Sequence, residues 1–247
     1  MRTPAPVELL DAWDAGWSQP GPERTRPLLH VAIEPDDSDP GRPDLGELSL
    51  GERDRLLVAL RTRLFGPVLT ARIDCPVCGV GLEAAVDTTD LLAAESPPAA
   101  LGVQVGGYAV ACRPLRSADL VDAGAIGSAA AARQLLVARA VLTAELDGVP
   151  VSAGDLPAEV VTAVAVALSE AEPLAAAELP IGCDACGAEW AAPLDINGFL
   201  WQEVDAWACR RLGEVHALAR AYGWSEEQVL GLSDRRRRRY LELVADG

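Results

Sequence analysis

The strongest constraint on this 247-residue chain is a pair of Cys-x-x-Cys-Gly motifs, at residues 75–79 and 183–187. The two-residue spacer lets both sulfurs of a motif face one point, and the glycine permits a tight turn behind the second cysteine. Four thiolates in two such pairs are the ligand set of a tetrahedral structural zinc ion. We therefore expect Zn²⁺ to be bound by Cys75, Cys78, Cys183 and Cys186. A disulfide or a redox pair is the alternative interpretation, because a single Cys-x-x-Cys is also typical of those.

The residues around the two motifs repeat as well. A shift of 108 residues superimposes Asp87 on Asp195 and Leu92 on Leu200. Each motif lies between two strand-like segments and is followed by an aspartate and the start of a helix. This pattern predicts a split zinc ribbon formed by residues 67–92 and 178–197. No His, Asp or Glu has the spacing of a further ligand, so we expect the ion to stabilise the fold, without catalysis, and expect Cys78→Ser to unfold the protein.

Charge and hydropathy narrow the class of protein. The net charge is −16, which disfavours a nucleic-acid partner, because phosphate contacts need clustered positive charge. No apolar run has the length of a membrane span, and the first residues do not form a signal peptide. We therefore expect no membrane association and a cytoplasmic location, which also suits reduced cysteines.

The rest of the chain predicts an α+β fold with helical parts on both sides of the split ribbon. The N-terminal helical region covers residues 1–66 and includes an acidic loop, 34–47, that we expect to be poorly ordered. An inserted hairpin-plus-helices segment covers 93–177, and a C-terminal helical hairpin covers 198–247.

Local signals place several elements within these regions. Helices are expected at about 23–33, 50–65, 129–142 and 156–171, and a hairpin with a Gly106-Gly107 turn at 103–111. The expected helix caps are Ser49, Ser117, Asn197, Ser225 and Ser233.

Other chemistry-bearing residues do not form a recognisable active site. The five arginines 235–239 would wrap all faces of a helix, so we expect some to pair with the protein's own carboxylates and others to face solvent. His216 is expected to be partly buried, and the lone residues Cys112 and Cys209 are expected to pack as small apolar side chains. The sequence predicts no enzyme.

The C-terminal stretch from Val215 to Ser233, followed by Arg236 to Leu243, resembles a known family. A helix ending in Tyr-Gly-Trp, a capped acidic turn, Leu-x-Leu-Ser and an Arg-rich Tyr-Leu run are similar to proteins of contractile injection systems and contractile phage tails. The resemblance is to the T-even-type phage baseplate hub-assembly family, in a zinc-knuckle variant. Segments 51–54, 107–120 and 133–141 agree with it.

This resemblance implies a non-enzymatic assembly factor or minor baseplate component of a phage-tail-like contractile injection system. Its partners would be baseplate, spike or other tail-apparatus proteins, bound through the C-terminal helical hairpin. The alternative is a zinc-ribbon module that acts in nucleic-acid transactions or regulation, for which residues 235–239 are the one basic run.

Overall fold

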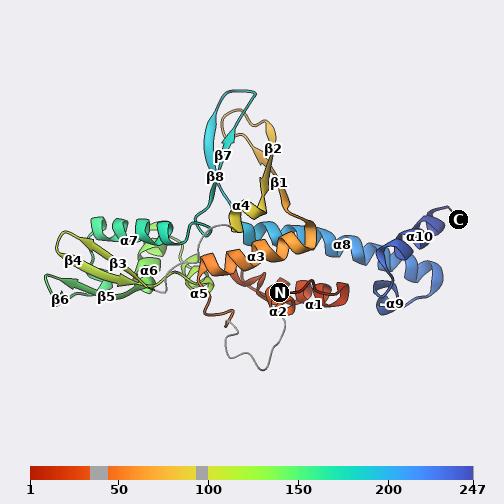
Figure 1. The fold of residues 1–247 in the computed structure, drawn as a ribbon, viewed down its shortest axis with the longest axis horizontal. Helices are drawn as coiled ribbons and strands as arrows, with labels where there is room; N and C mark the ends of the chain where they lie inside the picture. The colour runs from red at the N-terminus through yellow and green to blue at the C-terminus, as the bar shows by residue number, and fades with distance from the viewer. Residues whose placement is uncertain (34–43, 93–99, 247) are drawn as a thin grey trace.

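The computed structural model describes residues 1–33, 44–92 and 100–246, and it has the expected α+β composition (Figure 1). The helices are α1 (Pro6–Trp17), η1 (Gly21–Glu23), α2 (Arg26–Ala32), α3 (Leu50–Phe65), α4 (Thr88–Leu92), α5 (Ser117–Gly124), α6 (Ala129–Ala140), η2 (Ala153–Asp155), α7 (Ala158–Ala171), α8 (Ile196–Tyr222), α9 (Glu226–Leu230) and α10 (Asp234–Ala245). The strands are β1 (Val68–Asp74), β2 (Gly81–Asp87), β3 (Leu101–Val105), β4 (Tyr108–Cys112), β5 (Val141–Leu146), β6 (Val149–Pro150), β7 (Glu178–Gly182) and β8 (Glu189–Pro193).

The main core joins the two ends of the sequence. Leu28 of α2, Leu57 and Leu60 of α3 and Leu200 and Val204 of α8 are all fully buried in one cluster. Figure 1 shows α8 running alongside α3 and α1 at the centre of the molecule. The helical N-terminal region and the start of the C-terminal region therefore share a single hydrophobic core.

Side-chain caps fix where the central helices begin. The Ser49 hydroxyl accepts from the N–H of Glu52 at 3.1 Å, and the Glu52 carboxylate accepts from the N–H of Ser49 at 2.9 Å, a capping box as expected. The expectation for Asn197 is wrong: Asp195 is the N-cap of α8 and accepts from Gly198 N–H at 2.9 Å. A carboxylate two residues earlier reaches the free N–H groups of the first turn and also carries the charge that a helix N-terminus favours.

The inserted segment forms a four-stranded antiparallel sheet, β3-β4-β5-β6, with α6 and α7 packed against it. The β3–β4 turn has Gly106 and Gly107 at φ 55° and 83°, the left-handed values that a two-residue hairpin requires. The expected helix 129–142 is too long: α6 ends at Ala140, and β5 begins at Val141. Pairing of β5 with β4 outweighs the local helical pattern, and Val141 and Thr143 are β-branched residues that favour a strand.

Two further expectations in these regions need correction. Ser117 does not cap α5; it is the first helical residue, after Arg116, and its hydroxyl accepts from Arg53 at 3.0 Å. The helix expected at 23–33 begins instead at Arg26, after the short turn η1. Residues 34–43 of the acidic loop lie outside the described residues, so its order stays a prediction. Over the described ranges, each helix is too short or too polar to cross a membrane.

At the C-terminal end, α9 and α10 fold back against the end of α8. Ser225 and Ser233 are their N-caps, as expected. Arg237 is 2% exposed and bonds to Glu214 and to the Leu232 carbonyl, whereas Arg235, Arg236 and Arg238 are exposed. The mixed role expected for the arginine run is therefore confirmed. His216 is exposed, contrary to expectation, because it lies about 200° around α8 from Glu214, the residue that bonds to Arg237 of α10.

Candidate metal centre

Both cysteine motifs form the same tight turn at the tip of a two-stranded hairpin. In the first, Cys75 N–H donates to the Val80 carbonyl at 2.9 Å and Gly79 N–H donates to the Cys75 carbonyl at 2.9 Å. The equivalent bonds of the second, from Cys183 to Ala188 and from Gly187 to Cys183, are both 2.8 Å. Gly79 and Gly187 share φ 73°, a left-handed conformation that a side chain would strain. The sequence repeat is thus a repeat in backbone geometry.

The four predicted ligands meet at one point. The Sγ atoms of Cys75 and Cys186 lie 3.7 Å apart, as do those of Cys78 and Cys183, and all four sulfurs lie within 4.8 Å of one another. Around a tetrahedral ion with metal–sulfur bonds of about 2.3 Å, neighbouring sulfurs lie about 3.8 Å apart. The two cross-hairpin distances are far longer than the roughly 2.05 Å of a disulfide bond. The cluster therefore fits a metal ion.

Electrostatics within the cluster also favour a cation. The backbone N–H of Cys78 bonds to the Cys75 sulfur, and the N–H of Val77 does so more weakly. Together they outweigh the effect of desolvation and lower the pKa of Cys75 to about 6. The N–H of Ala188 favours the Cys186 thiolate, but burial and the three neighbouring sulfurs outweigh it and raise the pKa of Cys186 to about 12. Four thiolates at this spacing repel one another unless a cation neutralises them. A divalent ion would supply that charge.

The two hairpins have no strand pairing with each other. β1 pairs only with β2 and β7 only with β8 among the described strands, so they form two separate sheets. Figure 1 shows both hairpins side by side, projecting from the helices at the centre of the molecule. An isolated two-stranded hairpin is marginally stable in water. The cysteine cluster is therefore the feature that can hold the two tips together.

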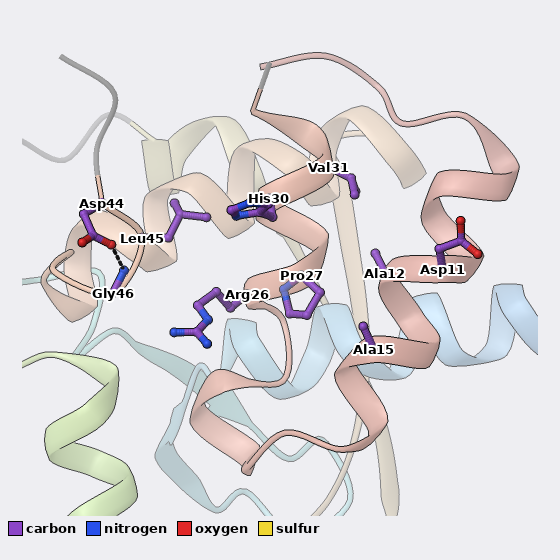
Figure 2. Close-up of a pocket in the computed structure, with 10 residues that line it drawn as sticks. All are labelled: Asp11, Ala12, Ala15, Arg26, Pro27, His30, Val31, Asp44, Leu45 and Gly46. Carbon is purple, nitrogen blue, oxygen red and sulfur yellow. Dashed lines mark hydrogen bonds between the residues drawn. The ribbon is translucent and has the colours of Figure 1, made fainter. Parts of the chain in front are cut away.

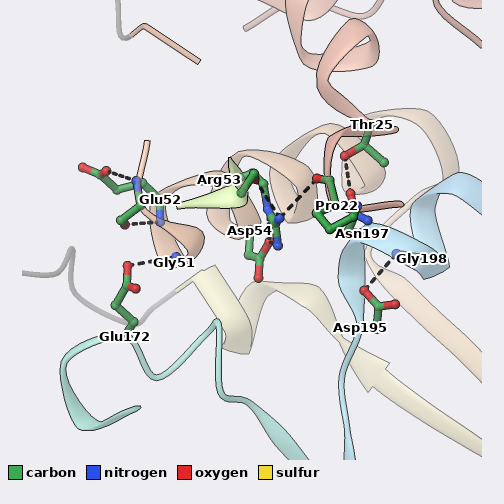
Figure 3. Close-up of polar contacts among 12 residues, drawn as sticks. Pro22, Thr25, Gly51, Glu52, Arg53, Asp54, Glu172, Asp195, Asn197 and Gly198 are labelled. Atoms are coloured by element: carbon green, nitrogen blue, oxygen red, sulfur yellow. Dashed lines mark hydrogen bonds and ion pairs between the residues drawn. The ribbon is translucent and has the colours of Figure 1, made fainter. Parts of the chain in front are cut away.

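A second cluster of titratable groups lies at the N-terminus of α3 (Figure 3). Arg53 bonds to the Asp54 carboxylate at 2.7 Å, to Ser117 Oγ at 3.0 Å and to the Pro22 carbonyl at 3.4 Å. The Glu172 carboxylate accepts from Gly51 N–H at 3.0 Å. We call this set of contacts the α3 junction, because it connects the insert and the N-terminal helices to α3.

Burial raises the pKa of two carboxyl groups in the α3 junction. Desolvation is the main cause for Asp54, despite its ion pair with Arg53, and it is also the main cause for Glu172. Each group bonds to the protein's own backbone or side chains. Perturbed carboxyl groups occur at catalytic sites and also in structural networks. These two hold separate parts of the fold together, and we assign them a structural role.

A groove of about 650 Å³ lies between α1, α2 and the turn at residues 44–46 (Figure 2). Ala12, Ala15 and Pro27 form an apolar wall, with Asp11, Arg26 and His30 around it. Arg26 already pairs with Glu23 at 3.0 Å, and Asp44 accepts from Gly46 N–H at 2.9 Å. The lining residues that the structure describes combine no nucleophile with a base, so the groove does not compete with the cysteine cluster as the candidate site.

Sequence reasoning identified the metal ligands but not the α3 junction. The four predicted ligands come together: Cys75, Cys78, Cys183 and Cys186. Cys112 is buried in the insert, as expected, but Cys209 is exposed on α8, so the expectation that it packs as an apolar side chain is wrong. No spacing signal marks Glu172, since its partner Gly51 lies 121 residues away. The one sequence signal for the Arg53–Asp54 pair is that the two residues are adjacent, directly after the residues that cap the helix.

Comparison with known proteins adds no relative. The chain matches no protein-family model, no curated protein and no solved structure. The functional argument therefore rests on the fold and on the four-cysteine site.

Proposed function

We propose that the four cysteines bind one structural Zn²⁺ that joins the two hairpins. Tetrahedral sets of four sulfurs are typical of zinc or of iron, and the distances across the hairpins support such a set. Four protein sulfurs occupy all four coordination positions of a tetrahedral ion, which leaves no position for a reactive water. Elemental analysis of the purified protein tests the metal: one zinc per chain supports the proposal, and iron with visible thiolate absorption contradicts it.

We further propose that the protein is a non-enzymatic assembly factor or minor baseplate component of a phage-tail-like contractile injection system. The family resemblance is concentrated in the segment that forms the end of α8 with α9 and α10. The observation that best supports a binding role is the surface of that segment. Tyr222 stacks on Trp224 with ring centroids 4.8 Å apart, and Tyr240 packs edge-on against Trp224 at 4.8 Å.

This aromatic cluster lies on the same helical unit as the exposed arginines. Tyr222 is 41% exposed, and Arg235, Arg236 and Arg238 of α10 face solvent. Aromatic residues and arginine dominate the energetics of many protein interfaces. An acidic surface on a baseplate, spike or other tail-apparatus protein is the matching partner.

The test is affinity purification from the native cell, followed by mass spectrometry. We expect sheath, tube or baseplate subunits to be recovered with the wild type and with Arg63→Glu, an exposed control on α3, but lost with Arg238→Glu. Recovery of ribosomal, polymerase or DNA-bound proteins would instead favour the alternative zinc-ribbon function. That alternative also requires a salt-dependent affinity for nucleic acid, which a filter-binding titration measures.

A further inference from the structure

Arg24 occupies an unusual position between two tryptophans. Its guanidinium carbon lies 5.9 Å from the ring centroid of Trp17 and 5.3 Å from that of Trp201. The Nε atom is buried and has no hydrogen-bond partner within the described chain. A buried polar group without a partner is costly, and such exceptions often mark a site for a ligand or water.

Other arginines show how unusual this is. Every other buried or half-buried arginine in the described ranges makes a hydrogen bond or ion pair with a carboxylate, hydroxyl or carbonyl oxygen. These residues are Arg2, Arg53, Arg55, Arg61, Arg113, Arg116, Arg211 and Arg237. Within the described ranges, the Arg24 guanidinium has contacts with the two tryptophan rings but no bond to an oxygen atom. Because a stacked guanidinium keeps its N–H edge free for an anion, Arg24 is prepared for a partner that the chain itself does not provide.

Arg24 lines a cavity of about 500 Å³ at the start of α8, which is large enough for a side chain of another molecule. Trp201 and Leu120 contribute apolar walls. Asn197 also lines this cavity; it accepts from Thr25 at 2.5 Å, as Figure 3 shows, and donates to the Gly21 carbonyl at 2.9 Å. Since Arg53 is held by Asp54, Arg24 is the cation of this cavity that remains available to a ligand.

The packing around Arg24 is also close. A Cβ atom added at Gly16 would lie 2.5 Å from the Trp201 ring and 2.6 Å from the Arg24 carbonyl oxygen. The end of α1 therefore presses directly on this site. Such contacts hold the Arg24 backbone and the Trp201 ring in place, so that less conformational entropy is lost when a ligand binds.

We propose that Trp17, Arg24 and Trp201 form a docking site for an acidic side chain of a partner protein. The partner's carboxylate binds the Nη groups of Arg24, and an adjacent apolar side chain of the partner covers Trp17, which is 53% exposed. A carboxylate fits better than a phosphate, because Asp195 lines the same cavity and would repel a group carrying nearly two negative charges. The site is separate from the C-terminal surface: Trp201 and Tyr222 are about 30 Å apart along α8. It does not depend on the partner being a tail-apparatus protein.

The test uses the full chain with its metal. Peptides are selected from a displayed random library on the immobilised protein, and the binding of the selected peptides is measured. We expect them to share an acidic residue next to an apolar or aromatic one. Affinity should fall by about tenfold or more with Arg24→Gln, the loss of roughly 1.4 kcal/mol, and remain unchanged with the exposed control Arg63→Gln.

A direct measurement on the unmodified protein covers the case in which Arg24→Gln disturbs the tryptophans. In the NMR spectrum, the Arg24 Nε–H signal should shift saturably with a selected peptide and not with its Glu→Gln counterpart. The proposal is wrong if no peptide is enriched, if the enriched peptides lack an acidic residue, or if Arg24→Gln binds them equally well. A shift caused by inorganic phosphate but not by the peptide would overturn it in favour of a phosphate site.

Discussion

Replacing one cysteine ligand, as in Cys78→Ser, is expected to release the metal ion and free both hairpins while the helical core stays folded. The reason is the distribution of buried residues. No residue of β2 or β7 is buried, and Leu69 of β1 and Ala192 of β8 are the buried positions of the other two strands. The main core draws almost entirely on the helices. The structure thus predicts a narrower effect than the global unfolding expected from the sequence.

The size of the effect follows from the loop that the metal closes. Cys78 and Cys183 are 105 residues apart in sequence. In the chain-entropy model, a cross-link that closes a loop of this length stabilises the folded protein by about 5 kcal/mol. Domains commonly have a free energy of unfolding of about 5–15 kcal/mol, so the core can survive this loss. For a chain of this size, the melting temperature should fall by about 10–20 °C.

Three measurements test this prediction, with Cys209→Ser as the matched control, because Cys209 is an exposed cysteine outside the cluster. Elemental analysis gives the metal content, circular dichroism gives the melting temperature, and hydrogen exchange locates the change. In Cys78→Ser, amides of residues 68–87 and 178–193 should lose protection while those of α3 and α8 keep it. The control should match the wild type in all three.

Two results would refute this reasoning. If Cys78→Ser kept the metal and the wild-type melting temperature, the four sulfurs would not form the metal site that was inferred from their distances to join the two hairpins. If the amides of α3 and α8 lost protection together with the hairpins, the core would depend on the metal, and burial would have been a poor guide to the cooperative unit.

Three further predictions concern the helical core and its junctions. Arg237→Ala should destabilise the protein by about 1.5–3 kcal/mol, because it removes the bonds to Glu214 and to the Leu232 carbonyl while Arg211 remains to pair with Glu214. Arg238→Ala on the exposed face should change stability by less than about 0.5 kcal/mol in the same denaturant titration. Gly16→Ala should cost about 1–3 kcal/mol through its clash with Trp201, and Gly213→Ala, with open space around it in α8, should instead stabilise by about 0.4–1 kcal/mol. Glu172→Gln should remove a pH dependence: burial raises the pKa of Glu172 in the folded protein, so its contribution is fully present below the ordinary value of 4.5 and is lost as pH rises through the raised folded pKa. The stability of the wild type relative to this variant should therefore fall across that window; a difference that rises with pH would contradict the burial argument.

Features set by neighbouring residues were the most predictable from sequence. The cysteine turns depend on a five-residue pattern, and the repeat with period 108 indicated that they are equivalent. Ser49, Ser225 and Ser233 were correct caps, because a cap is recognised from the residues that follow it. The Gly106-Gly107 hairpin was predicted for the same reason.

Features that depend on distant contacts were missed. β5 follows α6 without a break, and its strand conformation depends on pairing with β4, about 30 residues earlier in the chain. Trp201 and Trp207 are six positions apart on α8 and so point to different sides of the helix, yet neither is exposed, since α1 and α9 cover that part of α8. The setting of Arg24 involves rings from two separate helices, and no local pattern indicates it.

The insert is held to the core by a second set of contacts that does not involve the cysteines. Leu50 N–H donates to the Leu115 carbonyl at 2.8 Å, and Gly51 N–H donates to Glu172 at 3.0 Å, so the first turn of α3 is bonded to both ends of the insert's helical part. These two amides should therefore keep their exchange protection when the metal is removed. Adding Glu172→Ala to the metal-free protein should then expose Gly51, and Cys78→Ser alone should not. Loss of protection at Gly51 in Cys78→Ser would mean that the hairpins, and not the α3 junction, position the insert.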